Sequence, residues 1–239
     1  MSVSTAEPEP LDGASTKSSG RWSRRPGNFD MLNLRCLFQG VAPLGIPRVK
    51  GSHFEPSGLV AYNYTRDMLR KRQLGDTVHF FLDDYRFESC WTSPERAVER
   101  IEPFGHALGP DFSVYPWMPR VMQEWQVYRA RWVAAYWEWR GIDVIPTATW
   151  SSGDSFDLCF SGLPRGVPLA ASAVGISPGE SRDLFRAGLT ALCRELEPSR
   201  LIIYGGLGDL ADGLDLPPRR EYPTMHELRG WRHRRRIES

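Results

Sequence analysis

Short apolar runs that alternate with amphipathic stretches constrain the fold of this chain more than any other feature. Continuous apolar runs occur at 58–64, 78–82, 112–115, 142–147, 169–174 and 201–204. Runs of this kind are typical of strands in a parallel sheet that is covered on both faces. Helical patterns lie between them, at 94–102, 119–140 and 180–196. The alternation predicts an α/β fold with a mostly parallel sheet made of right-handed βαβ units.

Two architectures satisfy this pattern: an open, doubly wound sheet, and an incomplete, barrel-like sheet. A complete (β/α)₈ barrel has eight strands and about 250 residues. The whole chain has 239 residues, so a complete barrel is disfavoured. The two alternatives remain equally compatible with the pattern of apolar runs.

The two ends of the chain differ in composition from its centre. Residues 1–28 are rich in Ser, Pro, Gly and charged residues, which predicts a disordered tail because little apolar surface is available for burial. Residues 29–215 are predicted to form a single α/β domain, and 216–239 a basic C-terminal tail. The chain has no apolar run of the ~18 residues that a membrane span needs and no signal-peptide core. These features predict a cytoplasmic protein without membrane contact.

The predicted helix at 119–140 carries an arginine on its apolar side. Its aromatic stripe is expected to face the core, with a base-stacking surface as the alternative; it comprises Val121, Trp125, Tyr128, Trp132, Tyr136 and Trp139. Arg129 lies about 40° from Trp125 around the helix, within this stripe. A buried guanidinium cannot lose its proton, so Arg129 must pair with a carboxylate or bind an anion. The predicted partner is one of the acids that follow the strands.

Acidic and polar residues follow several of the predicted strands, where α/β folds place their sites. The candidate catalytic acids are Asp84, Glu88, Asp111 and Asp157. The candidate substrate- or anion-binding residues are Arg86, Tyr115, Arg129, Trp150 and Ser151. Side chains alternate along a strand, so Asp84 is expected to face the site while Asp83 caps the chain or pairs with Arg86. Such acids suit Mg²⁺ or Mn²⁺ in phosphoester chemistry, or general acid–base catalysis.

Several stretches together resemble a known family. They are FLDDYRFESCW (81–91), PDFSVYPWMP (110–119), QEWQVYRARWVAAYW (123–137), VIPTATW (144–150) and SFDLCFSGLP (155–164). In this order they resemble a bacterial, phage and plasmid domain family of unknown function. The resemblance covers roughly 60–210 and implies an α/β domain of actinobacterial mobile elements, without a known activity or catalytic residues. Where the family often has an Asp after the tyrosine, this chain has Pro116 and Trp117, which weakens the enzyme hypothesis.

Three functions from different classes follow from these features. The first is nucleic-acid binding, of DNA or RNA, by flexible basic ends that contact phosphates; the arginines concerned are Arg21, Arg24, Arg25, Arg232, Arg234, Arg235 and Arg236. The second is a metal-dependent phosphoester hydrolase, similar to a nuclease, that uses the acids at the strand ends. The third is a protein-interaction scaffold or inhibitor.

Overall fold

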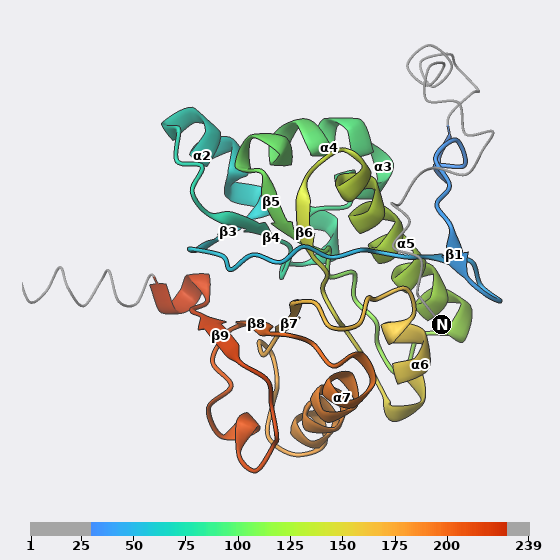
Figure 1. Ribbon diagram of the computed structural model, residues 1–239, viewed down its shortest axis with the longest axis vertical. Coiled ribbons are helices and arrows are strands. Elements are labelled where there is room, and N and C mark those ends of the chain that lie inside the picture. The colour runs from blue at the N-terminus through green and yellow to red at the C-terminus, as the bar shows by residue number, and fades with distance from the viewer. Residues whose placement is uncertain (1–29, 229–239) are drawn as a thin grey trace, which may run out of the picture.

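The computed structural model describes residues 30–228, and it confirms the predicted α/β fold (Figure 1). One parallel sheet has the order β3-β4-β5-β6; its strands are β3 (Leu59–Ala61), β4 (Thr77–His79), β5 (His106–Leu108) and β6 (Asp143–Ile145). A second parallel sheet has the order β7-β8-β9; its strands are β7 (Leu169–Ser172), β8 (Leu201–Tyr204) and β9 (Arg219–Tyr222). A short antiparallel pair precedes them, β1 (Gly40–Val41) and β2 (Ile46–Pro47).

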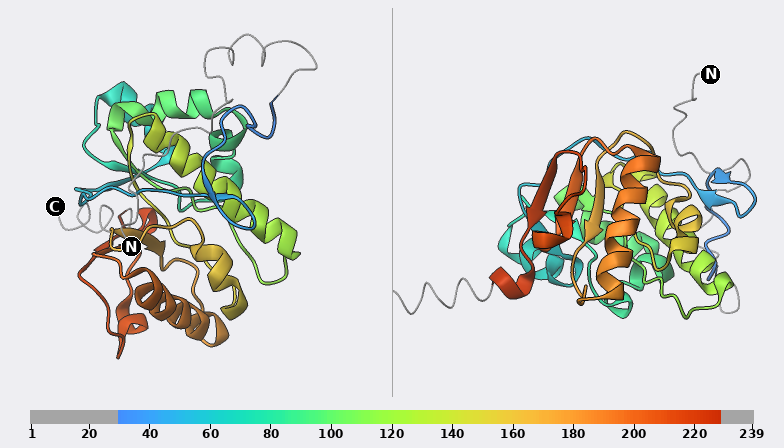
Figure 2. Two further views of the ribbon diagram at one scale, coloured as in Figure 1. Left: turned by 45° about the vertical axis from the view of Figure 1, so that its right-hand side comes forward. Right: turned by 90° about the horizontal axis from the view of Figure 1, so that it is seen from below.

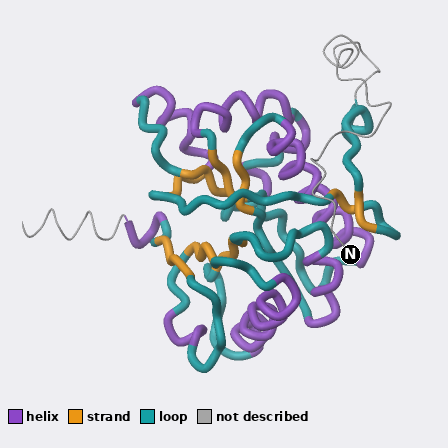
Figure 3. The backbone as a smooth tube through the Cα atoms, in the orientation of Figure 1, coloured by secondary structure: helices purple, strands orange, loops and turns teal. Residues whose placement is uncertain are grey.

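Helices cover the outer faces of both sheets, and the strands lie inside (Figures 1 and 3). The helices beside the first sheet are α2 (Thr65–Lys71), α3 (Ser89–Thr92), α4 (Pro94–Ile101) and α5 (Arg120–Trp139). Those beside the second sheet are α6 (Phe156–Phe160) and α7 (Glu180–Leu196). Short 3₁₀ turns occur at η1 (Tyr62–Tyr64), η2 (Asp84–Arg86), η3 (Glu102–Phe104), η4 (Gly153–Ser155) and η5 (Gly208–Ala211).

The two sheets are joined into one curved, open arrangement. Just beyond β6, Thr147 forms a parallel bridge with Ala170 of β7. The Ala148 amide donates to the Ala170 carbonyl over 2.8 Å, and the Ala170 amide donates to Pro146 over 2.9 Å. The strands therefore follow one another in chain order, whereas a doubly wound sheet reverses its order. Of the two predicted architectures, the incomplete barrel-like sheet is the one observed.

The free edges of this arrangement approach each other without strand pairing between them in the described residues. The Tyr222 hydroxyl in β9 donates to the Pro56 carbonyl, which precedes β3. Arg200 and Arg220 both form ion pairs with Glu55 on the same connection. Side chains, rather than a backbone ladder, thus link the two edges. Figure 2 shows the two sheets and their helices from two further directions.

Alternate residues along the strands face opposite layers, as the period of a strand requires. In β8, Leu201 and Ile203 pack with the helix-side core around α7, and Ile202 packs inward. The inward layer contains Leu108, Ile145, Ala170, Ile202 and Tyr222. An inner layer contributed by successive strands is the packing expected inside a barrel-like sheet.

The structure corrects three predictions about these elements. Residues 112–115 form no strand; Phe112 and Val114 are buried in a loop, and the strand lies earlier, as β5. The segment 219–222 forms β9 and pairs with β8, so Arg219 and Arg220 belong to the sheet and not to a separate basic tail. Pro119 is the residue before the first turn of α5 rather than within it.

The aromatic stripe of α5 changes its surroundings along the helix. Trp132 and Tyr136 are buried as predicted, but Val121 and Trp125, near the start of the helix, are exposed. The opposite face is buried as well, since Ala130 and Ala134 are almost inaccessible. The stretch 129–137 of α5 is therefore buried on all sides, and Glu138 and Trp139 at its end are partly exposed. The helix ends at Trp139, and Gly141, which follows the capping residue Arg140, has a φ of +82° that suits glycine.

Candidate active site at the strand ends

A cavity of about 560 Å³ opens at the carboxyl ends of β5, β6 and β7, next to the start of α7. Its acidic members are Asp111, after β5, and Glu180, the first residue of α7. Its residues with hydroxyl groups are Thr149, Ser151, Ser172 and Ser181, and its rings are those of Tyr115, Trp150 and Phe185. Among residues 30–228, no Lys, Arg or His lines it. Both charged groups that face this cavity are therefore hydrogen-bond acceptors when ionised.

Asp111 is partly buried, and burial raises the pKa of its carboxyl group to about 6. A hydrogen bond from the Thr149 hydroxyl opposes this rise, as does the positive charge of Arg131, while the nearby negative charge of Asp84 increases it. A carboxyl group with this pKa changes its protonation near neutral pH, as a general acid or base does.

Ser151 contributes a hydroxyl that lacks a hydrogen-bond partner among the described residues, although only 3% of the residue is exposed. Its backbone amide donates to the Ser155 hydroxyl over 3.1 Å, which fixes the turn between β6 and α6. The hydroxyl oxygen itself is almost inaccessible, so Ser151 lines the cavity with its other atoms and does not offer this hydroxyl to a ligand there.

Trp150 forms an aromatic wall beside Ser151. Its ring packs against Phe185 of α7, with ring centres 5.4 Å apart, and edge-on against Phe160 of α6 at 6.3 Å. Gly188 of α7 lies directly beneath the indole, and a Cβ atom at that position would overlap it. Contacts from two helices thus hold the Trp150 ring in one orientation.

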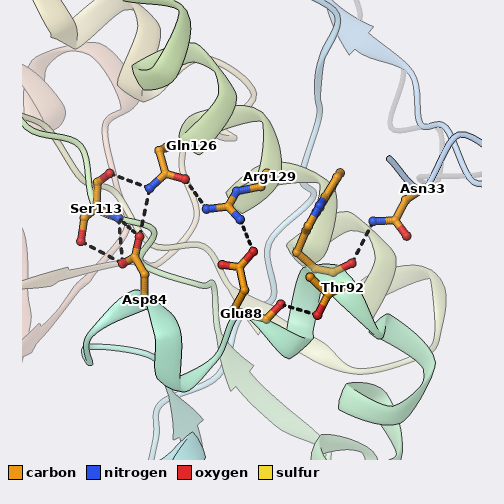
Figure 4. Close-up of polar contacts among 8 residues, drawn as sticks. Asn33, Asp84, Glu88, Thr92, Ser113, Gln126 and Arg129 are labelled. Atoms are coloured by element: carbon orange, nitrogen blue, oxygen red, sulfur yellow. Dashed lines mark hydrogen bonds and ion pairs between the residues drawn. The ribbon is translucent and has the colours of Figure 1, made fainter. Parts of the chain in front are cut away.

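A second group of polar residues lies beside the cavity and fixes the loop after β5 (Figure 4). The Asp84 carboxylate accepts bonds from the Ser113 amide and hydroxyl, and from the Gln126 side chain over 2.9 Å. Gln126 in turn accepts a bond from Arg129, which forms a 2.6 Å ion pair with Glu88. The predicted pairing of Arg129 with a strand-end acid is confirmed.

Arg129 is also held by contacts besides this ion pair. Its guanidinium carbon lies 4.1 Å from the centre of the Phe112 ring. Only 9% of its side chain is exposed, against 40% for that of Glu88. The pair thus joins α5 to the turn that precedes α3, with one partner within the protein and the other half-open to solvent.

Arg131 is a buried cation that the sequence did not single out. It is 3% exposed, and it donates to the carbonyl groups of Thr147, Cys159 and Ser161 at 3.2, 2.5 and 3.1 Å. Burial lowers its pKa to about 10, and the Asp111 charge opposes that change. By donating to carbonyl groups after β6 and at the end of α6, Arg131 holds these two segments together beside the cavity. The sequence feature that could have identified Arg131 is an arginine in the middle of an aromatic helix.

The predicted site residues fall into separate places. Asp111, Tyr115, Trp150 and Ser151 come together in the cavity wall, and Asp84, Glu88 and Arg129 form the adjoining network. Arg86 is exposed and forms an ion pair with Asp83 at 3.0 Å. This is one of the two roles predicted for Asp83, the neighbour of Asp84. Asp157 is exposed on α6 and is absent from the cavity wall. The terminal arginines proposed for nucleic-acid contact lie outside the described residues.

Within residues 30–228, no group of three or more His, Cys, Asp or Glu side chains is arranged so that it could hold a metal ion. No helix in the same range combines the length and the apolar character needed to cross a lipid bilayer.

Comparison with known proteins places the chain in a phage family. It is 46% identical over 215 residues to the Gene 1 protein of Mycobacterium phage L5, covering 90% of this chain and 93% of that protein. It is 45% identical to the Gene 1 protein of Mycobacterium phage D29, covering 90% of this chain and 79% of that protein. No solved structure matches. Residues 38–223 match the model of a domain of unknown function, DUF4417. The predicted resemblance is confirmed: the chain belongs to the DUF4417 family.

Proposed function

We propose that this phage-family protein binds a small, neutral or cationic ligand in the cavity at the strand ends, and that Asp111 binds the ligand and exchanges a proton with it. The observation that carries the proposal is the position of Asp111 in the wall of a cavity that is also lined by the rings of Tyr115, Trp150 and Phe185. The cavity size lies within the range of small-molecule sites, about 300–1,000 Å³.

The position of the cavity supports this assignment. Asp111 follows β5, Trp150 and Ser151 follow β6, and Ser172 ends β7, so neighbouring strands direct polar groups into one space. In barrel-like α/β folds, catalytic groups come from this end of several strands. The pKa of Asp111, raised to about 6 by burial, suits a group that accepts a proton at neutral pH and returns it.

The charge of the cavity argues against phosphate-bearing ligands. In the part of the chain that the structure describes, its charged lining residues are Asp111 and Glu180, and no basic residue belongs to its wall. A phosphate would be repelled by these carboxylates, whereas phosphate sites normally present Arg, Lys or backbone amides. The hypothesis of a metal-dependent phosphoester hydrolase gains no support, because its four candidate acids do not converge on one point in the described structure.

The test is a ligand-observed NMR screen of the full-length protein with fragments that are neutral, cationic or phosphorylated. We expect neutral or cationic fragments to bind, with binding lost in Asp111→Asn and retained in Asp157→Asn, whose carboxylate is exposed on α6. Binding confined to phosphorylated fragments, or hits indifferent to Asp111→Asn in a folded protein, would contradict the proposal.

A second candidate function is nucleic-acid binding by the terminal arginines, which we propose on the basis of their clustering at 21–25 and 232–236 in a phage-family protein. Basic segments of this kind bind phosphates in a strongly salt-dependent way. The test is fluorescence anisotropy with labelled single- and double-stranded DNA and RNA over a salt series. Glutamine variants at Arg232, Arg234, Arg235 and Arg236 should weaken binding; equal affinity would contradict this function. Substitution is preferable to deletion from 217, which would remove β9.

A further inference from the structure

The wall of the cavity contains both a carboxyl group, that of Asp111, and an indole ring, that of Trp150. A carboxylate accepts several hydrogen bonds, and the bond from Thr149 uses only part of this capacity at Asp111. The Trp150 ring is held in place by Phe185 and by the close approach of Gly188. A ligand in the cavity can therefore meet an acceptor and an aromatic ring in the same space.

Further residues with hydroxyl groups line the same cavity, namely Thr149, Ser172 and Ser181. A hydroxyl group can both donate and accept a hydrogen bond, so this wall suits a polar ligand rather than an apolar one.

We infer that the cavity takes a planar group with two adjacent N–H donors, which pairs with the Asp111 carboxylate and stacks on Trp150. Two sources supply this chemistry: a guanidinium cation, or the donor edge of a guanine ring. Both present two roughly parallel N–H groups, which match the two oxygens of a carboxylate. The inference rests on the proposed function and names the ligand class for the same site.

Its planar shape distinguishes the guanidinium member of this class from ammonium cations. A guanidinium stacks on an aromatic face and donates in a fixed fork, whereas an ammonium group is a compact, strongly hydrated charge. The second carboxylate, Glu180, is exposed at the edge of the cavity and adds favourable charge for a cation. Tyr115 borders the same space, and its ring stacks on that of Trp117 with centres 5.1 Å apart and planes 5° from parallel. A ring-bearing ligand can extend over this exposed pair.

The experiment is calorimetric titration of the full-length protein, at a pH of about 7.5, with two matched pairs of compounds. Agmatine is compared with N-acetylputrescine, which keeps the ammonium end but has an amide with a single N–H in place of the guanidinium. Guanosine is compared with inosine, which lacks the 2-amino group. We expect one compound with the double donor to bind about tenfold to a hundredfold more tightly than its partner, the range for loss of a charge-assisted hydrogen bond. Preference in the first pair identifies the cation, and preference in the second identifies the base.

Variants connect the preference to the named residues. Asp111→Asn should remove it, and Asp157→Asn should leave it unchanged; circular dichroism and thermal melting verify that each variant is folded. Less than tenfold preference in both pairs, or preference retained in folded Asp111→Asn, overturns the inference. If fragments of other shapes still bind in an Asp111-dependent manner, the proposed function stands while this ligand class is rejected.

Discussion

The Asp84 carboxylate accepts hydrogen bonds from both donors of Ser113: from the hydroxyl at 2.8 Å, and from the backbone amide at 3.1 and 3.2 Å to its two oxygens (Figure 4). Ser113 is two residues after Asp111, in the loop that replaces the predicted strand. Asp84 therefore fixes the loop that carries Asp111, and its role in this geometry is positioning.

Substitution Asp84→Asn should reduce stability, because an amide cannot accept all the bonds that the carboxylate accepts from Ser113 and Gln126. We expect a loss of about 1–3 kcal/mol in the free energy of unfolding, measured by urea denaturation. NMR titration should also show a lower pKa for Asp111, because a negative charge nearby has been removed. Asp83→Asn, at an exposed neighbour, should change stability by less than about 0.5 kcal/mol. Equal effects of the two variants would contradict the positioning role.

Substitution Arg129→Gln should destabilise the fold by about 1–3 kcal/mol, because it removes the pair with Glu88, the bond to Gln126 and the contact with Phe112. Glu88 is half-open to solvent, so the loss stays below that of a fully buried pair. The control is Arg70→Gln, which breaks an ion pair of the same 2.6 Å length whose Arg and Asp67 side chains are 77% and 51% exposed. Chemical denaturation should detect little change there.

Asp111→Asn should alter the pH dependence of stability. The folded pKa of Asp111 lies above its usual value, so the folded state binds this proton more tightly than the unfolded state does. Stability from this group falls as pH rises from about 4 to about 6. The variant should consequently gain stability relative to the wild type between pH 4 and pH 7, by up to about 2 kcal/mol. Urea denaturation at several pH values measures the difference, and a difference that does not vary with pH would contradict the assigned shift.

Glu138 should contribute separately to the pH dependence of stability, over a range that extends to slightly higher pH than that of Asp111. Its carboxylate accepts the backbone amides of Lys50 at 3.0 Å and Gly51 at 2.8 Å, and burial raises its pKa to about 7. Because this folded pKa is also raised, its contribution to stability is lost as pH rises from about 4.3 to about 7. The Tm of Glu138→Gln relative to that of the wild type should therefore be higher at pH 8 than at pH 5. A relative Tm that is lower at pH 8 would contradict the upward shift of the Glu138 pKa.

Gly188→Ala should disturb the cavity from the helix side, because the added Cβ would overlap the Trp150 indole. Alanine is the better helix former by about 1 kcal/mol, but the overlap should outweigh this gain and destabilise the protein by about 1–3 kcal/mol. The shift of Trp150 should also weaken binding of any ligand held in the cavity. Gly75→Ala is the matched control, since an added Cβ there meets no atom within 4 Å. A stabilising effect of Gly188→Ala would show that the ring yields freely.

The sequence by itself determined the features that depend on local patterns. The helix α7 lies at the residues that its apolar spacing predicted, and the run LIIY forms β8. The need of Arg129 for a carboxylate was also predictable, because burial of an unpaired guanidinium is costly wherever it occurs. These conclusions require only periodicity and the energy of a charge in an apolar environment.

Tertiary structure decided the features that depend on distant neighbours. The apolar run at 112–115 became a buried loop because Phe112 packs on Phe87 and Ser113 bonds to Asp84. The charged segment at 219–222 became a strand because the edge of β8 was available to pair with it, while most of its own side chains stay exposed. The meeting of Asp111, Trp150 and Ser151 depends on the curvature that places the ends of β5, β6 and β7 around one space. No local pattern encodes that curvature, because it arises from how strands pair and twist across the whole sheet.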